Sequence, residues 1–166
     1  NIRVKGSDNL LFNKTIRTLR EKLGNYYYGK DEDTIQSVVS NLLIKHNLSL
    51  AIAESCTGGL ASKKITDISG SSSFFKGSIV AYSNNIKKTI LDISKKSLDE
   101  SGAVSEQVAV EMCNNITVQF KTDLGLSITG VSGPSGGSED KPVGLFYIGV
   151  SLREKSTTKK FIFNTN

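Results

Sequence analysis

The segment that decides the fold is LSLAIAESCTGG, residues 48–59. Its apolar first half, residues 48–53, has the length and composition of a buried strand. Apolar residues at helical spacing follow from Leu60 to Ile68. A strand that runs into a helix through such a turn is the building unit of α/β domains, and ligands bind where the strand ends. We therefore expect an α/β fold with a binding site near Ser55.

Strands and helices alternate through the rest of the chain. We predict further strands at residues 79–82, 124–129, 143–152 and 159–163, and further helices at residues 85–91 and 105–120. A helix before the first strand follows from the spacing of the apolar residues between Ile35 and Leu43, with Asp33 or Thr34 as its N-cap. The last two strands form a hairpin, which makes the sheet mixed. The predicted fold class is α/β, a three-layer α/β/α domain with a mixed, mostly parallel sheet.

The first 30 residues have a separate pattern. We predict a strand at residues 1–5, a helix at residues 9–23 with Gly24 as its C-terminal cap, and a second strand at residues 25–28. This pattern is typical of the end of a small α/β module, and the charged run at residues 30–33 follows it. We therefore place a domain boundary after residue 30.

The net charge of +5 is confined to this N-terminal segment. Residues 1–30 hold the whole excess of basic residues, whereas residues 31–166 contain equal numbers of basic and acidic residues. A main domain without excess positive charge does not favour nucleic-acid binding. No apolar run reaches the length of a membrane span and no signal peptide leads the chain, so we expect a cytoplasmic protein.

Histidine and cysteine are scarce. The single histidine, His46, excludes zinc sites built on several histidines, and it is the only imidazole that a catalytic triad could use. Its position near the end of a predicted helix favours a solvent-facing role. Cys56 and Cys113 are too few for a disulfide framework or a cysteine-based zinc site. Cys113 lies in the apolar pattern of a helix, so we expect it in the core.

Ser55 is the strongest candidate for a nucleophile. It ends the first strand and precedes residues 57–59, so its side chain points into the crevice beside helix N–H groups that can hold a phosphate or an oxyanion. Alternatively, Ser55 or Thr57 only caps the helix. The G-x-S-x-G turn of α/β-hydrolases is absent, because Ala53 stands in place of its first glycine. Cys56 is a rival nucleophile that needs activation by a helix N-terminus or a lysine.

A possible base lies in the segment YSNNIK, residues 82–87, just past a second predicted strand. A serine without a histidine partner needs another base, and Lys87 can serve if its pKa falls by about three units. The Tyr82 hydroxyl could relay the proton. The alternative is that Tyr82 only ends a strand and that Lys87 lies on the surface.

The glycine-rich segment GVSGPSGG, residues 130–137, follows another predicted strand. Its backbone N–H groups could surround an anion. It lacks the Lys-Ser/Thr pair of a P-loop and the spacing of a dinucleotide-binding fingerprint. A flexible connecting loop is the alternative.

Six motifs, taken in order, closely resemble the C-terminal domain of the competence/damage-inducible CinA family. They are ESCTGG (54–59), GSS (70–72), YSNxxK (82–87), GAVS (102–105), TGVSGPSGG (129–137) and KPVG (141–144). Residues 1–30 resemble the end of the KH-like middle module of longer family members. The resemblance implies that residues 31–166 form the CinA C-terminal amidase domain without the C-terminal helix of the family.

The resemblance implies hydrolysis of nicotinamide mononucleotide to nicotinate mononucleotide and ammonia, in bacterial pyridine nucleotide salvage. The catalytic residues of the family match Ser55, Tyr82 and Lys87. Ser55 would attack the carboxamide carbon, and Lys87, directly or through Tyr82, would take the proton. No metal or cofactor is implied. The residues expected to bind substrate are Cys56, Thr57, Gly58, Gly59, Asn84, Gly130, Ser132, Gly133, Gly136 and Gly137.

The expected partners are the mononucleotide substrate, the rest of a full-length CinA chain, and further copies of the chain in a homo-oligomer. We expect no membrane among them, because no apolar run is long enough to span one. We do not expect nucleic acid either, because residues 1–30 lack the G-x-x-G loop with which a KH module binds it. The alternative to an enzyme is a nucleotide-binding or interaction module of a competence or DNA-damage protein without hydrolytic activity.

Overall fold

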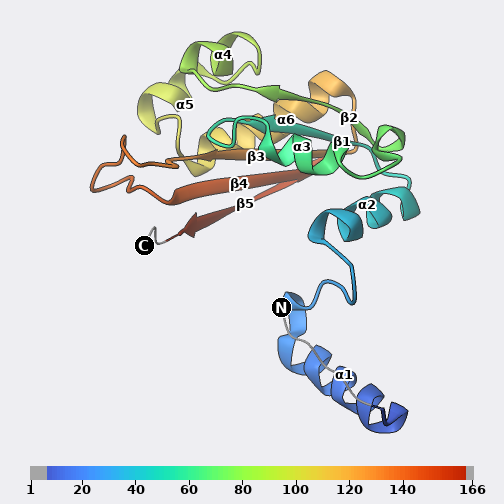
Figure 1. The fold of residues 1–166 in the computed structure, drawn as a ribbon. Helices are drawn as coiled ribbons and strands as arrows, with labels where there is room; N and C mark the ends of the chain where they lie inside the picture. Colours follow the sequence, from blue (N-terminus) through green and yellow to red (C-terminus); the bar gives the residue numbers. More distant parts are fainter. Residues whose placement is uncertain (1–6, 164–166) are drawn as a thin grey trace. The chain divides into compact units, whose positions relative to one another are not determined.

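The computed structural model describes residues 7–163 (Figure 1). The strand predicted at residues 1–5 lies outside them. The chain divides into two compact units, Asn1–Val38 and Val39–Asn166, and each is described by itself. The domain boundary after residue 30 stays a prediction.

The N-terminal unit contains the predicted helix, α1 (Asn9–Leu23). Asp8 caps it, since its carboxylate accepts hydrogen bonds from the N–H groups of Leu10 and Leu11. The strand predicted at residues 25–28 is wrong, because the chain continues into a 3₁₀ turn, η1 (Gly24–Tyr26), which Tyr27 N–H closes by donating to Gly24 O at 3.1 Å. The described residues of this unit contain no second strand with which the tyrosines could pair.

The larger unit is built on a five-stranded sheet with the order β2-β1-β3-β4-β5. Its strands are β1 (Leu50–Glu54), β2 (Phe75–Val80), β3 (Leu124–Gly130), β4 (Leu145–Leu152) and β5 (Lys155–Ile162). β1 pairs in parallel with both β2 and β3, whereas β4 is antiparallel to both β3 and β5. Only β4 therefore runs against the other strands, which confirms the mixed, mostly parallel sheet.

Helices cover both faces of the central strands (Figure 1). The helices are α3 (Leu60–Thr66), α4 (Asn84–Thr89), α5 (Lys95–Glu100) and α6 (Glu106–Phe120), with a short 3₁₀ turn η2 (Ser71–Ser73). Helix α2 (Ile35–Lys45) belongs to this unit from Val39 on. On one face, α4, α5 and α6 pack on Ala51 and Ala53 of β1. On the other face, α3 and Leu43 pack on Leu50 and Ile52. This arrangement confirms the three-layer α/β/α architecture.

Small residues let α6 pack very close to the sheet. A side chain at Gly149 would meet the main-chain oxygen of Ala109, and one at Gly125 would meet that of Cys113. Cys113 itself is fully buried, as the sequence pattern predicted. Thr129 Oγ1, near the end of β3, donates a hydrogen bond of 2.8 Å to Ala103 O and so holds the α5–α6 connection, residues 101–105, beside the end of that strand.

Some predicted boundaries are wrong for physical reasons. β2 begins at Phe75 instead of residue 79, because Lys76 and Gly77 interrupt the apolar pattern that predicts a strand. The strand ends at Val80, before Tyr82. β5 begins at Lys155, where polar residues pair with β4. Helix α5 was not predicted, since its six residues are too few to show a helical period.

The strand register places three chain segments at one edge of the sheet. Glu54, the last residue of β1, lies opposite Val80 of β2 and Ile128 of β3. The residues that follow these three strands therefore meet at their carboxyl ends, which is where ligands bind in open α/β sheets. Within residues 7–163, no helix is both long enough and apolar enough to cross a membrane.

Candidate functional site

A pocket of about 330 Å³ opens at this edge of the sheet. Its floor is the turn after β1, with Ser55 and Cys56, and Tyr82 stands at one side. The α5–α6 connection contributes Ala103 and Val104, and the end of β3 with the loop after it contributes the remaining wall: Thr129, Gly130, Val131, Ser132, Gly133, Ser135 and Gly136. None of these lining residues is charged, so any charge that acts in the pocket comes from behind its walls or from backbone dipoles.

Ser55 and Lys87 lie in direct contact. Lys87 Nζ is 2.9 Å from Ser55 Oγ and donates a second hydrogen bond to Ala81 O at 2.8 Å. Lys87 is only 1% exposed and Ser55 is 7% exposed. Burial lowers the pKa of the Lys87 ammonium, and no carboxylate in the described part of the chain forms an ion pair with it. The pair therefore has the geometry of a serine next to a lysine that gives up its proton easily.

The short helix α4 carries Lys87 to this position. Ser83 caps the helix, since its Oγ accepts a hydrogen bond from Ile86 N–H at 3.2 Å. Ile86 packs against the core on the α6 side of the sheet, and Ala81 just before the helix is fully buried. Lys87 is thereby held on the inner side of α4, pointing back under the end of β2 toward Ser55.

Tyr82 is placed differently from the other two predicted catalytic residues. It lines the pocket but is 75% exposed, and within residues 7–163 its hydroxyl has no hydrogen bond to Ser55 or Lys87. Asn84 is exposed at the start of α4 and does not line the pocket. Lys87 thus reaches Ser55 without an intermediary.

Glu54 is a part of the site that the sequence analysis missed. Its fully buried carboxylate accepts hydrogen bonds from the N–H groups of Gly59, Ala61 and Ser62 and from the Ser62 hydroxyl. Burial alone would raise the pKa of Glu54, but the hydrogen bonds, those of Ser62 first, lower it. Helix α3 is therefore capped by Glu54, at the end of β1, and not by Ser55 or Thr57.

The hydrogen bonds of the Glu54 carboxylate determine which backbone N–H groups of the turn remain free to bind a ligand. Gly59, Ala61 and Ser62 are occupied by Glu54, and Leu60 N–H donates to Thr57 O at 3.0 Å. In the turn that follows Ser55, only the N–H groups of Cys56 and Thr57 have no acceptor among the described residues. They are the donors best placed to stabilise an oxyanion formed at Ser55. Of the contacts predicted in this turn, Cys56 lines the pocket, whereas Thr57, Gly58 and Gly59 do not.

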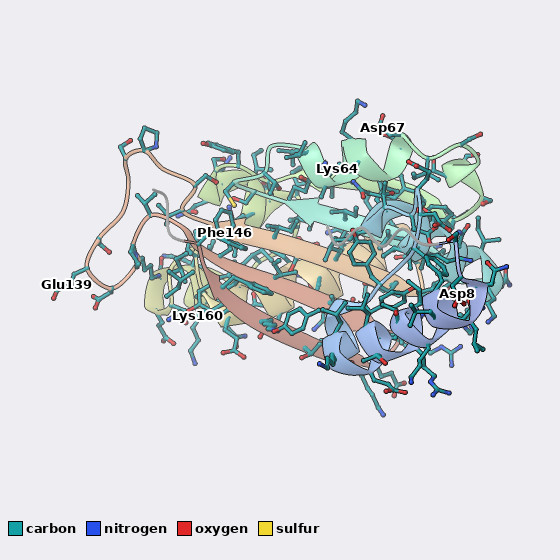
Figure 2. All side chains as sticks on the ribbon, turned by 60° about the horizontal axis from the view of Figure 1, so that its bottom comes forward. Asp8, Lys64, Asp67, Glu139, Phe146 and Lys160 are labelled. Carbon is teal, nitrogen blue, oxygen red and sulfur yellow. The ribbon has the colours of Figure 1, made fainter. Side chains whose placement is uncertain are left out.

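We expect Glu54→Gln to destabilise the domain by about 2–4 kcal/mol, because an amide places N–H donors against the N–H groups that the carboxylate serves. Urea unfolding followed by circular dichroism measures the difference. Glu139→Gln is the matched control, since Glu139 is exposed at the outer end of the β3–β4 loop (Figure 2). Equal stability of the two variants would show that the Glu54 carboxylate does not hold the turn.

The glycine-rich loop forms one wall of the pocket. The N–H groups of Ser132, Gly133, Ser135, Gly136 and Gly137 have no acceptor within residues 7–163. Ser132 Oγ donates a long hydrogen bond of 3.4 Å to Cys56 O, which ties the loop to the turn after β1. Of the predicted loop contacts, only Gly137 does not line the pocket. The loop therefore offers a row of backbone donors to an anion.

Cys56 is poorly suited to be the nucleophile. It is half-buried at the pocket floor, and burial raises the pKa of its thiol. A thiol with a raised pKa carries little of the reactive thiolate. The described residues also contain no cluster of three or more His, Cys, Asp or Glu side chains that could hold a metal ion.

Comparisons with known proteins give one family. Residues 32–166 match the family model described as CinA C-terminal domain. The chain is 47% identical over 144 residues to a CinA-like protein of Kosmotoga olearia and 43% identical over 150 residues to one of Dictyoglomus thermophilum, covering 87% and 90% of the chain. It covers 35% and 36% of those proteins, so it spans about a third of their length.

Solved structures have the same fold. The crystal structure of the competence/damage inducible protein CihA from Agrobacterium tumefaciens matches with a TM-score of 0.76 and 31% identity, over 78% of this chain and 79% of that one. A CinA superfamily protein from Escherichia coli matches with a TM-score of 0.75 and 30% identity, over 87% of both chains.

Proposed function

This chain belongs to the CinA family, and from that premise we propose that it is an amidohydrolase that converts nicotinamide mononucleotide and water to nicotinate mononucleotide and ammonia. The substrate comes from the resemblance described above, and the reaction type also has support from the site. The single observation that carries the proposal is the buried contact of 2.9 Å between Ser55 Oγ and Lys87 Nζ at the floor of the pocket.

The first half of the reaction forms an acyl-enzyme. Neutral Lys87 keeps an N–H on Ala81 O and turns its lone pair to the Ser55 hydroxyl, whose proton it takes as Oγ attacks the carboxamide carbon. The amide oxygen becomes an oxyanion facing the free N–H groups of Cys56 and Thr57. When the C–N bond breaks, Lys87 returns the proton to the leaving nitrogen, which departs as ammonia.

The second half restores the enzyme. Water gives a proton to Lys87 and attacks the ester carbon, and the C–O bond to Ser55 breaks as Oγ recovers its proton. The product is a carboxylic acid, which ionises to nicotinate mononucleotide at neutral pH. Every proton is handled by Lys87, so the scheme needs no histidine and routes no step through a metal.

The uncharged pocket suits the rest of the substrate. Ala103, Val104 and Val131 offer apolar surface to a pyridine ring. In the proposal, the phosphate lies against the free N–H groups of the glycine-rich loop, since backbone dipoles can hold an anion without a lysine or arginine side chain. Both contacts are part of the proposal, and nicotinamide riboside, which keeps the pyridine ring but lacks the phosphate, tests the phosphate contact.

The test of the reaction type is product identification. Purified protein is incubated with nicotinamide mononucleotide, and the products are separated by chromatography. The proposal requires nicotinate mononucleotide and ammonia in equal amounts. Free nicotinamide with ribose phosphate would mean cleavage of the glycosidic bond instead, and would reject the amidase.

We expect Tyr82→Phe to lower kcat less than tenfold, because Lys87 contacts Ser55 directly and the Tyr82 hydroxyl is not part of that contact. Steady-state kinetics of ammonia release give kcat for the wild-type protein and for the variant. A loss of about a thousandfold would instead identify Tyr82 as the group that relays the proton. The ring itself remains in Tyr82→Phe, so any effect reports on the hydroxyl.

A further inference from the structure

The loop between β3 and β4, residues 131–144, extends from the end of the sheet (Figure 1). Its first arm is the glycine-rich wall of the pocket, and Glu139 lies at its outer end (Figure 2). Most residues from 132 to 140 are exposed, so little packing holds this part of the loop in place. Its position over the pocket must therefore come from a small number of specific contacts.

Lys141, on the returning arm, makes one of these contacts. Its half-buried ammonium donates a hydrogen bond of 2.6 Å to Ser101 O in the α5–α6 connection. The same connection contributes Ala103 and Val104 to the lining of the pocket. A charged donor on a carbonyl makes a stronger hydrogen bond than a neutral one. Lys141 therefore links two chain segments that both line the pocket.

The surroundings of Lys141 fit this role. Gly102 has a positive φ of 74°, and a side chain there would come within 2.6 Å of Lys141 Nζ, so glycine leaves the space that the ammonium occupies. Lys141 N–H donates to Ser138 Oγ and Ser138 N–H donates to Lys141 O, which closes a tight turn next to the lysine. The turn fixes where the side chain leaves the loop.

Val143, on the returning arm, packs against the glycine-rich arm. A side chain added at Gly133 would meet the Val143 side chain at 2.4 Å, and one at Gly137 would meet Val143 N at 2.8 Å. The two arms are therefore in close contact. Fixing Lys141 on Ser101 also fixes the N–H groups of the first arm over the pocket.

We propose that Lys141 is a positioning residue that holds the glycine-rich loop against the α5–α6 connection and thereby sets the affinity of the pocket for its substrate. The part about affinity rests on the proposed function. Lys141 does not line the pocket and takes no part in proton transfer, so its loss should weaken binding and leave the chemical step intact.

Lys141→Met tests the proposal, because methionine has a similar length but cannot donate a hydrogen bond. Lys160→Met is the matched control: it removes the same charge from an exposed position on β5 (Figure 2). We expect Lys141→Met to raise KM for nicotinamide mononucleotide about tenfold with kcat nearly constant, and Lys160→Met to change neither. Lys141→Arg, which keeps a donor, should recover part of the affinity.

Hydrogen–deuterium exchange gives a second readout that does not depend on activity. The loop N–H groups that make hydrogen bonds, those of Ser138, Lys141 and Gly144, should exchange faster in Lys141→Met than in Lys160→Met, while β1 exchanges equally in both and shows that the sheet is intact. Unchanged loop exchange or an unchanged KM would overturn the proposal. If the wild-type protein has no turnover, the proposed function fails, and the exchange comparison alone supports or overturns the holding of the loop by Lys141.

Discussion

Replacing Lys87 with methionine should reduce ammonia release by at least about a thousandfold, because within residues 7–163 the variant removes the one base in contact with Ser55. Methionine fills the buried space without a charge, so the domain should remain folded. Lys88→Met is a closely matched control, since Lys88 is the next residue on α4 and is exposed. Comparable activity of the two variants would remove Lys87 from the mechanism.

The lowered pKa of Lys87 adds a dependence on pH. Catalysis needs the neutral amine, so kcat/KM should rise with pH through the pKa of Lys87, at a midpoint below the usual value for lysine. Stability should change in the same direction: between the folded and unfolded pKa values the unfolded chain binds more protons, so the free energy of unfolding rises with pH. Lys87→Met should lack this contribution. Identical pH slopes in the two proteins would contradict a neutral buried Lys87.

Replacing Ser55 with alanine should lower kcat by about four orders of magnitude, because no other hydroxyl of the described residues donates to or accepts from Lys87 Nζ. Substrate binding should persist, since the walls of the pocket are unchanged, and isothermal titration calorimetry can measure it. Cys56→Ala separates the rival nucleophile: it should lower kcat less than tenfold, as expected for a thiol with a raised pKa. Turnover that survives Ser55→Ala but not Cys56→Ala would assign the chemistry to the cysteine.

The alternation of elements predicted the fold well, because each central strand is apolar and each long helix has a clear period. Helix α6 is an example, with Val108, Met112 and Ile116 buried on one side. Elements that depend on pairing with a distant segment, or that are too short to show a period, could not be predicted from the sequence. The tyrosines at residues 26–28 have strand propensity but no strand to pair with among the described residues of their unit, and α5 is too short to show a period.

The same limit applies to the site. Ser55 and Lys87 could be proposed from the sequence because each follows a strand that ends at the same edge of the sheet. Glu54 was missed because a carboxylate before the nucleophile gives no sign in the sequence that it turns back to cap α3. The bond from Lys141 to Ser101 joins residues 40 positions apart, and no local pattern predicts such a contact. The reactive groups could be identified from the sequence, whereas the residues that position them could be identified only from the three-dimensional structure.

An amidase built on Ser55 and Lys87 is tested most directly by ammonia release from nicotinamide mononucleotide without added metal, measured side by side for the wild-type protein and Ser55→Ala. We expect steady release by the wild-type protein and none above background for the variant. A folded wild-type protein that releases no ammonia, or a variant that releases it at the same rate, would contradict an amidase built on Ser55 and Lys87.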